Sequence, residues 1–352
     1  MLAMSIVKVR YRKRLRFFYV SLIVFSILFI MTLVFSLTIG SANIGVDGVF
    51  EWILYKIGIH ALQPVNEGVL KIIELRFVRT LTAFIVGVML GVSGVILQAC
   101  SRNPLADPFI LGLSSGALSF LALAMLISPA LIYLRPIAIA IAFIGALIGF
   151  TITLALFEAT GGTSTSLVLS GIAVSTLFGG LGLIFSYMVY ARYKMHIVIY
   201  TLGCVSLTTK NDLMLMIVTL TIGIVLAILL SKPLNALIYG DEYAQQLGYN
   251  PRSVIRFGAI LASFLTGTAV AFTGVIGFIG LIVPHIARFI VGHDHRFVIP
   301  ASIFIGGLIL CYADVLVRLI ALTGLGEIPI GAITSIIGGP FLAYLIVKSL
   351  KA

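Results

Sequence analysis

The sequence predicts an all-α membrane protein with about ten transmembrane helices in a compact bundle. Of its 352 residues, 61% are hydrophobic and only 10% are charged, whereas soluble domains have roughly 45–50% apolar and about 25% charged residues. Apolar runs of about 20 residues, the length that crosses a bilayer, recur along the chain. The net charge of +11 is therefore expected to set orientation in the membrane, and it does not indicate nucleic-acid binding.

The first apolar run follows a segment that holds six Lys and Arg residues between positions 8 and 16. This run is longer than the core of a signal peptide, which has about 7–15 residues, so we expect it to be retained. The positive charges predict a cytoplasmic N-terminus, and an even number of spans places the C-terminus on the same side. The expected spans cover residues 17–39, 77–99, 109–127, 136–157, 166–190, 212–230, 256–273, 278–291, 298–320 and 329–347.

The seventh and eighth spans share too few residues for two full crossings and a turn. We therefore expect the Gly-rich stretch 273–280 to form the bend and one of the two helices to be truncated. Small residues at helical spacing, such as Gly87 and Gly91, predict that helices approach one another closely. The longest outer loop, 40–75, contains the only Trp, Trp52, in an amphipathic stretch expected to lie at the membrane surface.

A charged segment, 232–256, separates the sixth and seventh spans and is predicted to be a cytoplasmic loop. Pro233 and Pro251 bracket it as helix breakers. Within it, Asp241 and Glu242 suit the start of a short helix, and Gly248 suits its end. The residues alone leave two interpretations open: a solvated loop, or a docking helix for a soluble partner.

Two further inner segments carry polar residues. Hydroxyl residues from Thr163 to Ser166 precede the fifth span and are typical of a helix cap. The segment after the second span contains Asn103-Pro104, which favours a tight turn.

At the outer side, Arg76 and Arg79 lie at the entrance to the second span, and Arg318 lies near the end of the ninth. Asp314, one turn deeper on the same face, is expected to pair with Arg318. These arginines break the positive-inside trend. The simplest explanation is that they snorkel to lipid headgroups.

Neither a metal site, nor a cofactor site, nor enzymatic activity is predicted. The chain has no GxxxxGK[ST] motif, so any ATP hydrolysis must reside on a separate chain. A cluster of three histidines lacks the spacing of zinc motifs, and three cysteines are isolated. These residues are His285, His293, His295, Cys100, Cys204 and Cys311.

Several blocks of the sequence resemble the permeases of type II ABC importers, which take up iron-siderophores, haem and vitamin B12. The resemblance covers about residues 70–347. The family often has Pro at the position of Val78 and Trp at that of Thr201. The matching blocks include RFVR, NPLADPFILGLSSGA, TSLVLSG, NALIYGDEYAQQLG, GFIGLIVPHIAR, ADVLVR and EIPIG.

The resemblance implies roles for particular residues. Ser164 and Thr165 are similar to a cytoplasmic gate, and the turn at Asn103 and Pro104 is a shared loop motif. The three outer arginines, Arg76, Arg79 and Arg318, are similar to arginines that bind glutamates of an extracellular binding protein. The helix that fits a cleft in the ATPase would be formed by Asp241, Glu242, Ala244, Leu247 and Gly248.

The resemblance also implies an assembly in the cell membrane: a homodimer of this chain, two cytoplasmic ABC ATPases and one substrate-binding protein. Its substrate would be an iron(III) chelate or a similar large complex such as cobalamin or haem, and the sequence does not choose among them. The alternatives are a proton-coupled secondary transporter that uses Asp314 and an intramembrane hydrolase built on the histidines, which lacks a nucleophile.

Overall fold

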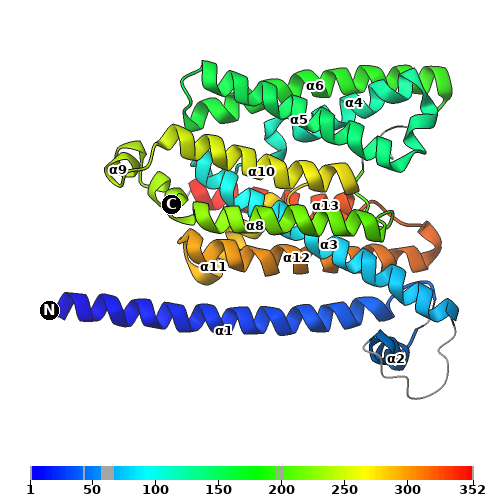
Figure 1. Ribbon diagram of the computed structural model, residues 1–352, viewed down its shortest axis with the longest axis horizontal. Coiled ribbons are helices and arrows are strands. Elements are labelled where there is room, and N and C mark those ends of the chain that lie inside the picture. Colours follow the sequence, from blue (N-terminus) through cyan, green and yellow to red (C-terminus); the bar gives the residue numbers. More distant parts are fainter. Residues whose placement is uncertain (1, 43, 57–66, 196, 198–201, 351–352) are drawn as a thin grey trace.

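The computed structural model describes residues 2–42, 44–56, 67–195, 197 and 202–350, and these form helices packed side by side (Figure 1). Within these residues the only extended pairing is an isolated bridge between Leu202 and Val275. The helices are α1 (Leu2–Thr38), α2 (Val46–Lys56), α3 (Glu67–Cys100), η1 (Pro108–Leu111), α4 (Leu113–Ile127), η2 (Pro129–Ile132), α5 (Arg135–Ala159), α6 (Ser164–Tyr193), α8 (Lys210–Ile238), α9 (Asp241–Gln246), α10 (Pro251–Thr273), α11 (Ile279–Val291), α12 (His295–Ile320), η3 (Ala321–Leu325) and α13 (Ile330–Leu350).

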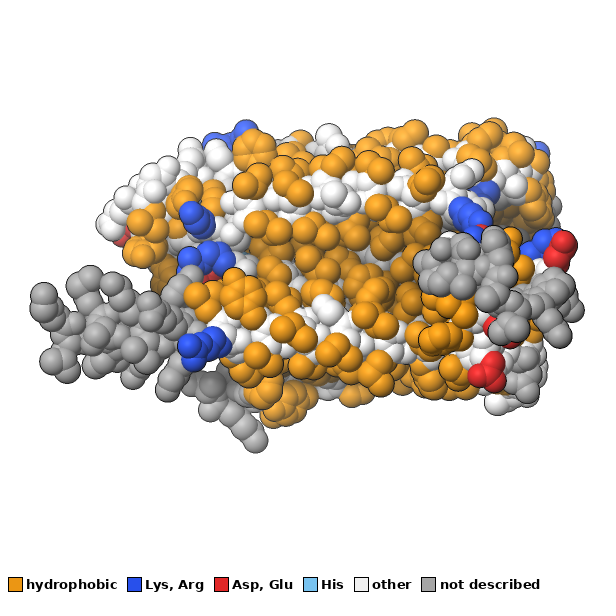
Figure 2. Space-filling model, turned by 60° about the horizontal axis from the view of Figure 1, so that its bottom comes forward, with side chains coloured by type: hydrophobic (Ala, Val, Ile, Leu, Met, Phe, Trp, Pro, Cys, Tyr) orange, Lys and Arg blue, Asp and Glu red, His pale blue; other side chains and the backbone are white. Residues whose placement is uncertain are grey.

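The all-helical membrane fold is confirmed. Every predicted span falls on a helix of the structure, and seven described helices are long and apolar enough to cross a membrane by length and composition. Three shorter apolar helices, α4, α11 and the described part of α13, account for the other predicted spans. On the face shown in Figure 2, a broad band of hydrophobic side chains lies between charged ends, as expected for a chain embedded in lipid. The number of crossings and the orientation of the termini remain predictions.

Helix α3 runs through the centre of the bundle, and α8, α10, α11 and α12 pack around it. Its apolar stretch is 89% buried within the chain, against 22% for α1, which lies at the edge. The crossing of α3 and α12 depends on glycine, because a Cβ added at Gly87 would lie 2.1 Å from the carbonyl oxygen of Gly306. The small-residue spacing therefore marks a close helix contact, as predicted.

The bend between the seventh and eighth predicted spans is also confirmed. Helix α10 ends at Thr273, and α11 begins at Ile279 after Phe278, which adopts a left-handed conformation with φ of 69°. Helix α11 has 13 residues, and at about 1.5 Å per residue it is too short to cross a core of about 30 Å.

The expectation that Pro233 breaks the sixth span is wrong, because α8 continues through it to Ile238. The extra turns are held by packing, since Leu234 and Leu237 are fully buried. Arg102 Nε also donates to the Leu237 carbonyl at 2.8 Å, which satisfies one of the free carbonyls at the helix end. The predicted loop 232–256 is therefore reduced to the short helix α9 and its flanking turns.

The predicted amphipathic stretch around Trp52 forms α2. Its Trp52 is buried and packs against Phe77, with ring centroids 5.2 Å apart. Thr201 lies outside the described residues, as do the side chains of residues 8–14.

Candidate transport and docking sites

Helix α9 projects from the end of the bundle at which α1 starts (Figure 1). Helix α9 begins after Gly240 and is followed by Gly248, and both glycines have positive φ. Its two ends therefore agree with the predicted start at Asp241 and the predicted stop at Gly248. Ala244 is the only buried residue of α9, whereas Glu242 and Leu247 are exposed. Ala244 therefore packs α9 against its own chain, and the other predicted coupling residues are exposed.

Arg102 ties this helix to the loop that follows α3. Its guanidinium forms an ion pair with Asp241 at the first turn of α9. Beside it, Asn103 Oδ1 accepts a hydrogen bond from the Leu105 amide at 2.9 Å, so Asn103-Pro104 forms the tight turn that its residues predict.

The predicted gate lies at the start of α6. Thr163 and Ser166 form a capping box, in which each side chain accepts a hydrogen bond from the other residue's amide. Their hydroxyls are therefore occupied by the helix cap. Ser164 and Thr165 are not part of the cap: the Ser164 hydroxyl is buried with no partner among the described residues, and Thr165 is exposed.

Glu158 was not among the residues selected from the sequence, and it connects the segment before the predicted gate to the segment after α9. It lies near the end of α5, and its carboxylate pairs with Arg252 and Arg256 at the start of α10. The Arg252 Nε donates to it at 2.8 Å. Because the partners are more than 90 residues apart in the chain, spacing in the sequence could not reveal them.

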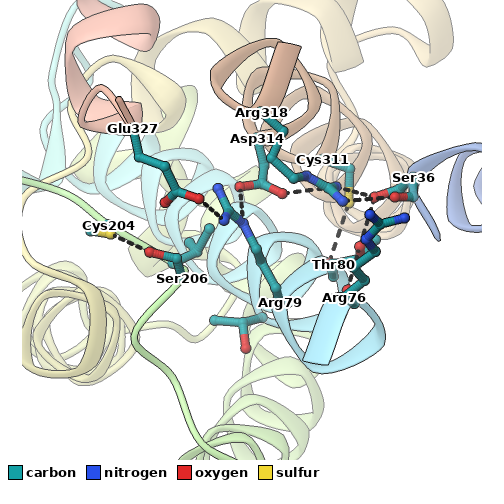
Figure 3. Close-up of polar contacts among 12 residues, drawn as sticks. Ser36, Arg76, Arg79, Thr80, Cys204, Ser206, Cys311, Asp314, Arg318 and Glu327 are labelled. Carbon is teal, nitrogen blue, oxygen red and sulfur yellow. Dashed lines mark hydrogen bonds and ion pairs between the residues drawn. The ribbon is translucent and has the colours of Figure 1, made fainter. Parts of the chain in front are cut away.

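At the other end of the bundle, Arg76 and Arg318 are buried and point toward the end of α1 (Figure 3). Their guanidiniums donate hydrogen bonds to carbonyl oxygens that have no intrahelical partner, and a cation suits the negative end of the helix dipole. The accepting carbonyls belong to Ser36, Leu37, Thr38, Ile39 and Ala42, at distances of 2.6–3.2 Å. Both arginines thus cap α1, and neither is free to bind a partner in this conformation.

Arg79 lies closer to the surface and joins two carboxylates. Its Nε donates to Asp314 Oδ1 at 2.8 Å, and its Nη1 donates to Glu327 at 2.6 Å. Asp314 is 1% exposed and also pairs with Arg318 at 3.0 Å, as predicted. The hydrogen bond from Arg79 holds the pKa of Glu327 below its usual value, although its partial burial alone would raise that pKa.

Comparison with known proteins agrees with this architecture. Residues 28–348 match the FecCD transport family. The chain is 34% identical over 312 residues to the "Iron(3+)-hydroxamate import system permease protein FhuB" of Bacillus subtilis, covering 88% of this chain and 78% of that one. It is 39% identical over 286 residues to the "Probable heme-iron transport system permease protein IsdF" of Staphylococcus aureus, covering 81% of this chain and 84% of that one.

A solved structure has the same fold along nearly the whole chain. It is described as "An inward-facing conformation of a putative metal-chelate type ABC transporter". It superposes with a TM-score of 0.78 at 26% identity and covers 94% of this chain and 99% of that one. The fold and the projecting helix define a multi-pass membrane permease. The chain belongs to the FecCD transport family.

Proposed function

We propose that this chain forms the translocation pathway of an ABC importer for an iron(III) chelate or haem. The names of its relatives support this substrate class, and cobalamin remains a further candidate of similar size. The observation that carries the proposal is α9, a short polar helix that leaves the apolar bundle and exposes all but one of its side chains. Such a helix is suited to fit a cleft in a cytoplasmic ATPase.

The assembly that we infer contains two copies of this chain, two ATPases and one extracellular substrate-binding protein. One chain supplies one pair of gate hydroxyls, Ser164 and Thr165, so a second copy is needed to close a pathway between them. A ring of small hydroxyl groups is narrow and weakly polar, which suits a gate that does not trap a charged chelate.

At the outer face, Arg79 and Glu327 are the residues that we propose for docking of the binding protein. Arg76 and Arg318 already cap α1, whereas Arg79 shares its guanidinium with Glu327, whose side chain is 44% exposed. An acidic residue of a binding protein could replace Glu327 as the partner of Arg79, since Arg pairs bidentately with carboxylates.

The buried ion pairs also weigh against a proton-coupled transporter that uses Asp314. Two arginines lie within 3.0 Å of its carboxylate, and Asp314 is buried between them. Asp314 thus already serves as the shared ion-pair partner of Arg79 and Arg318, which weighs against a role as a proton carrier.

The test is uptake by proteoliposomes that contain this chain with its ATPase and binding protein. We expect ATP-driven uptake of iron(III)-hydroxamate or haem, and we expect Gly248→Val to abolish it. A β-branched residue at φ +82° costs roughly 1–3 kcal/mol of backbone strain and would displace the end of α9.

Gly324→Val is the matched control, because Gly324 has φ +87°, is also surrounded by open space and is far from α9. Normal uptake by the Gly248 variant would refute the coupling role of α9, and uptake driven by a proton gradient without any ATPase would refute the whole proposal.

A further inference from the structure

An open pocket of about 470 Å³ lies where α3, α8 and α11 end and α12 begins, at the end of the bundle that carries α9. Among the described residues that line it, none is Asp or Glu. The polar side chains that line it are Gln98, Arg102, His285, Arg288, His293 and His295. The pocket is therefore a concentration of cationic and hydrogen-bonding groups without an internal counter-ion.

Arg288 is the main source of its positive charge. The guanidinium donates to Gln98 Oε1, and no carboxylate among the described residues pairs with it. Gln98 is buried and is itself held by the carbonyls of Ala106 and Gly280, so it gives Arg288 a fixed position. Arg288 is half-buried. A cation that has lost part of its hydration and has only a neutral partner is destabilised, and an anion bound beside it would offset that cost.

The carboxylates of Asp241 and Asp294 do not supply this anion, because each is paired with another residue. Asp241 pairs with Arg102. Asp294 is ionised, since hydrogen bonds from Arg296 and Asn235 outweigh its burial and lower its pKa to about 2. The Asp294 carboxylate accepts hydrogen bonds from those two residues, at 2.8 Å from the Asn235 amide nitrogen. Asp294 does not line the pocket.

The neutral histidines contribute neither positive charge nor a free donor. His285 and His295 each hold Nδ1 within 2.9 Å of an oxygen, that of the Leu281 carbonyl and that of the Asn235 amide. Each ring therefore has Nε2 left for a ligand, and Nε2 donates only when the ring is protonated. Arg288 consequently provides the permanent positive charge that no carboxylate among the described residues offsets.

The rim of the pocket is apolar. Phe289 is 89% exposed and Ile238 is 45% exposed, and both lie near the ends of apolar helices. We propose that the pocket binds the phosphate group of an anionic ligand. The rim favours a phospholipid headgroup, whose acyl chains would lie against Phe289 and Ile238, over free phosphate. An Arg fork matches the geometry of phosphate oxygens, and basic pockets between membrane helices on the cytoplasmic side are known to accept anionic headgroups.

The test is ligand binding to the purified full-length chain in detergent. The chain is titrated separately with phosphatidylglycerol, phosphatidylcholine and inorganic phosphate. Thermal unfolding and native mass spectrometry report binding, since a ligand of the folded state raises the unfolding midpoint. We expect phosphatidylglycerol to bind and phosphatidylcholine not to bind. A response to inorganic phosphate as well would show that the phosphate group suffices, and a response to inorganic phosphate alone would assign the site to a free anion.

Arg288→Gln should weaken binding roughly tenfold or more, the loss expected for one charged hydrogen bond. His293→Glu, at an exposed loop position, should do the same without disturbing the core, so it carries the test if the Arg288 variant fails to fold. Arg16→Gln, which removes an exposed positive charge from α1 outside the pocket, is the matched control and should bind normally.

Three results would overturn the proposal. The first is the absence of binding by any of the anions. The second is equal weakening in the Arg16 control, which would indicate a general effect of charge. The third is unchanged anion binding in both the Arg288 and the His293 variants, because the anion would then bind outside this pocket.

Discussion

The side chains of Arg76 and Arg318 explain why arginines lie at the predicted outer face of an apolar bundle. Both donate to carbonyl oxygens at the end of α1, which water could not easily reach beside lipid. Unpaired backbone groups cost several kcal/mol in a bilayer. These arginines therefore hold the peripheral helix α1 against α3 and α12.

This role predicts that Arg318→Ala destabilises the protein. The substitution frees the carbonyls of Ser36 and Ile39 and leaves Asp314 with Arg79 as its single cation. Breaking a buried ion pair costs about 3–5 kcal/mol, and the remaining Arg79 should keep the loss near the lower value. Thermal unfolding of the purified chain measures it.

The matched control is Lys71→Ala, which removes an exposed cation from α3 near the same end. It should leave the unfolding midpoint unchanged. If the Arg318 variant melts together with this control, Arg318 does not cap α1 in the membrane protein, and its docking role becomes available again.

At the scale of elements, Glu158 joins the segment that follows α9 to the segment that precedes the predicted gate. Its ion pairs with Arg252 and Arg256 are partly exposed, and such pairs contribute little to stability. They are therefore too weak to matter much for the stability of the bundle. Their position, between the end of α5 and the start of α10, is suited to transmit a movement of α9 to Ser164 and Thr165.

We therefore expect Glu158→Gln to lower ATP-driven uptake severalfold while the unfolding midpoint and the ATPase rate of the complex stay close to normal. Uptake and ATP hydrolysis are measured on the same proteoliposomes. Glu51→Gln, an exposed carboxylate on α2 at the other end of the chain's bundle, is the control. The charge swap Glu158→Arg with Arg252→Glu should recover part of the uptake if the ion pair itself transmits the movement of α9. Normal uptake in Glu158→Gln would exclude this role of the ion pair.

At the scale of the whole molecule, the features set by local chemistry could be predicted from the sequence. The apolar runs located the helices, and Asp241 with Gly248 located the short helix α9. Pro233 was misjudged because burial of Leu234 and Leu237 outweighs the local penalty of a proline. Arg76, Arg318 and Glu158 find their partners across long stretches of the chain, so their roles depend on packing that no local pattern contains.

The exposed apolar faces also bear on assembly. Helices α5, α6 and α8 are only 28–33% buried within their apolar stretches, so each leaves most of its surface for lipid or for a second copy. The predicted gate residues lie at the start of α6, one of these open helices. If two copies pair so that their α6 starts meet, Thr165, which is exposed, should come closer to its counterpart than the half-buried Ser164.

This arrangement predicts a disulfide-linked dimer of Thr165→Cys when the pathway is closed. The experiment uses a Cys204→Ser background, because Cys100 and Cys311 are buried and Cys204 is the more accessible native thiol. A disulfide requires Cα atoms about 4.4–6.8 Å apart, so it forms only if the two α6 starts nearly touch. Oxidation of the complex with its ATPase, in each nucleotide state and followed by non-reducing electrophoresis, measures it.

Thr160→Cys is the control, since Thr160 is an exposed hydroxyl residue of the same loop whose side chain bonds to the Leu156 carbonyl. It should crosslink less, and Ser164→Cys should give an intermediate yield. Absence of the Thr165 dimer in every nucleotide state, while the complex still contains two copies of the chain, would place the closing residues elsewhere. Strong crosslinking of Thr160 in place of Thr165 would move the gate from the helix start into the preceding loop.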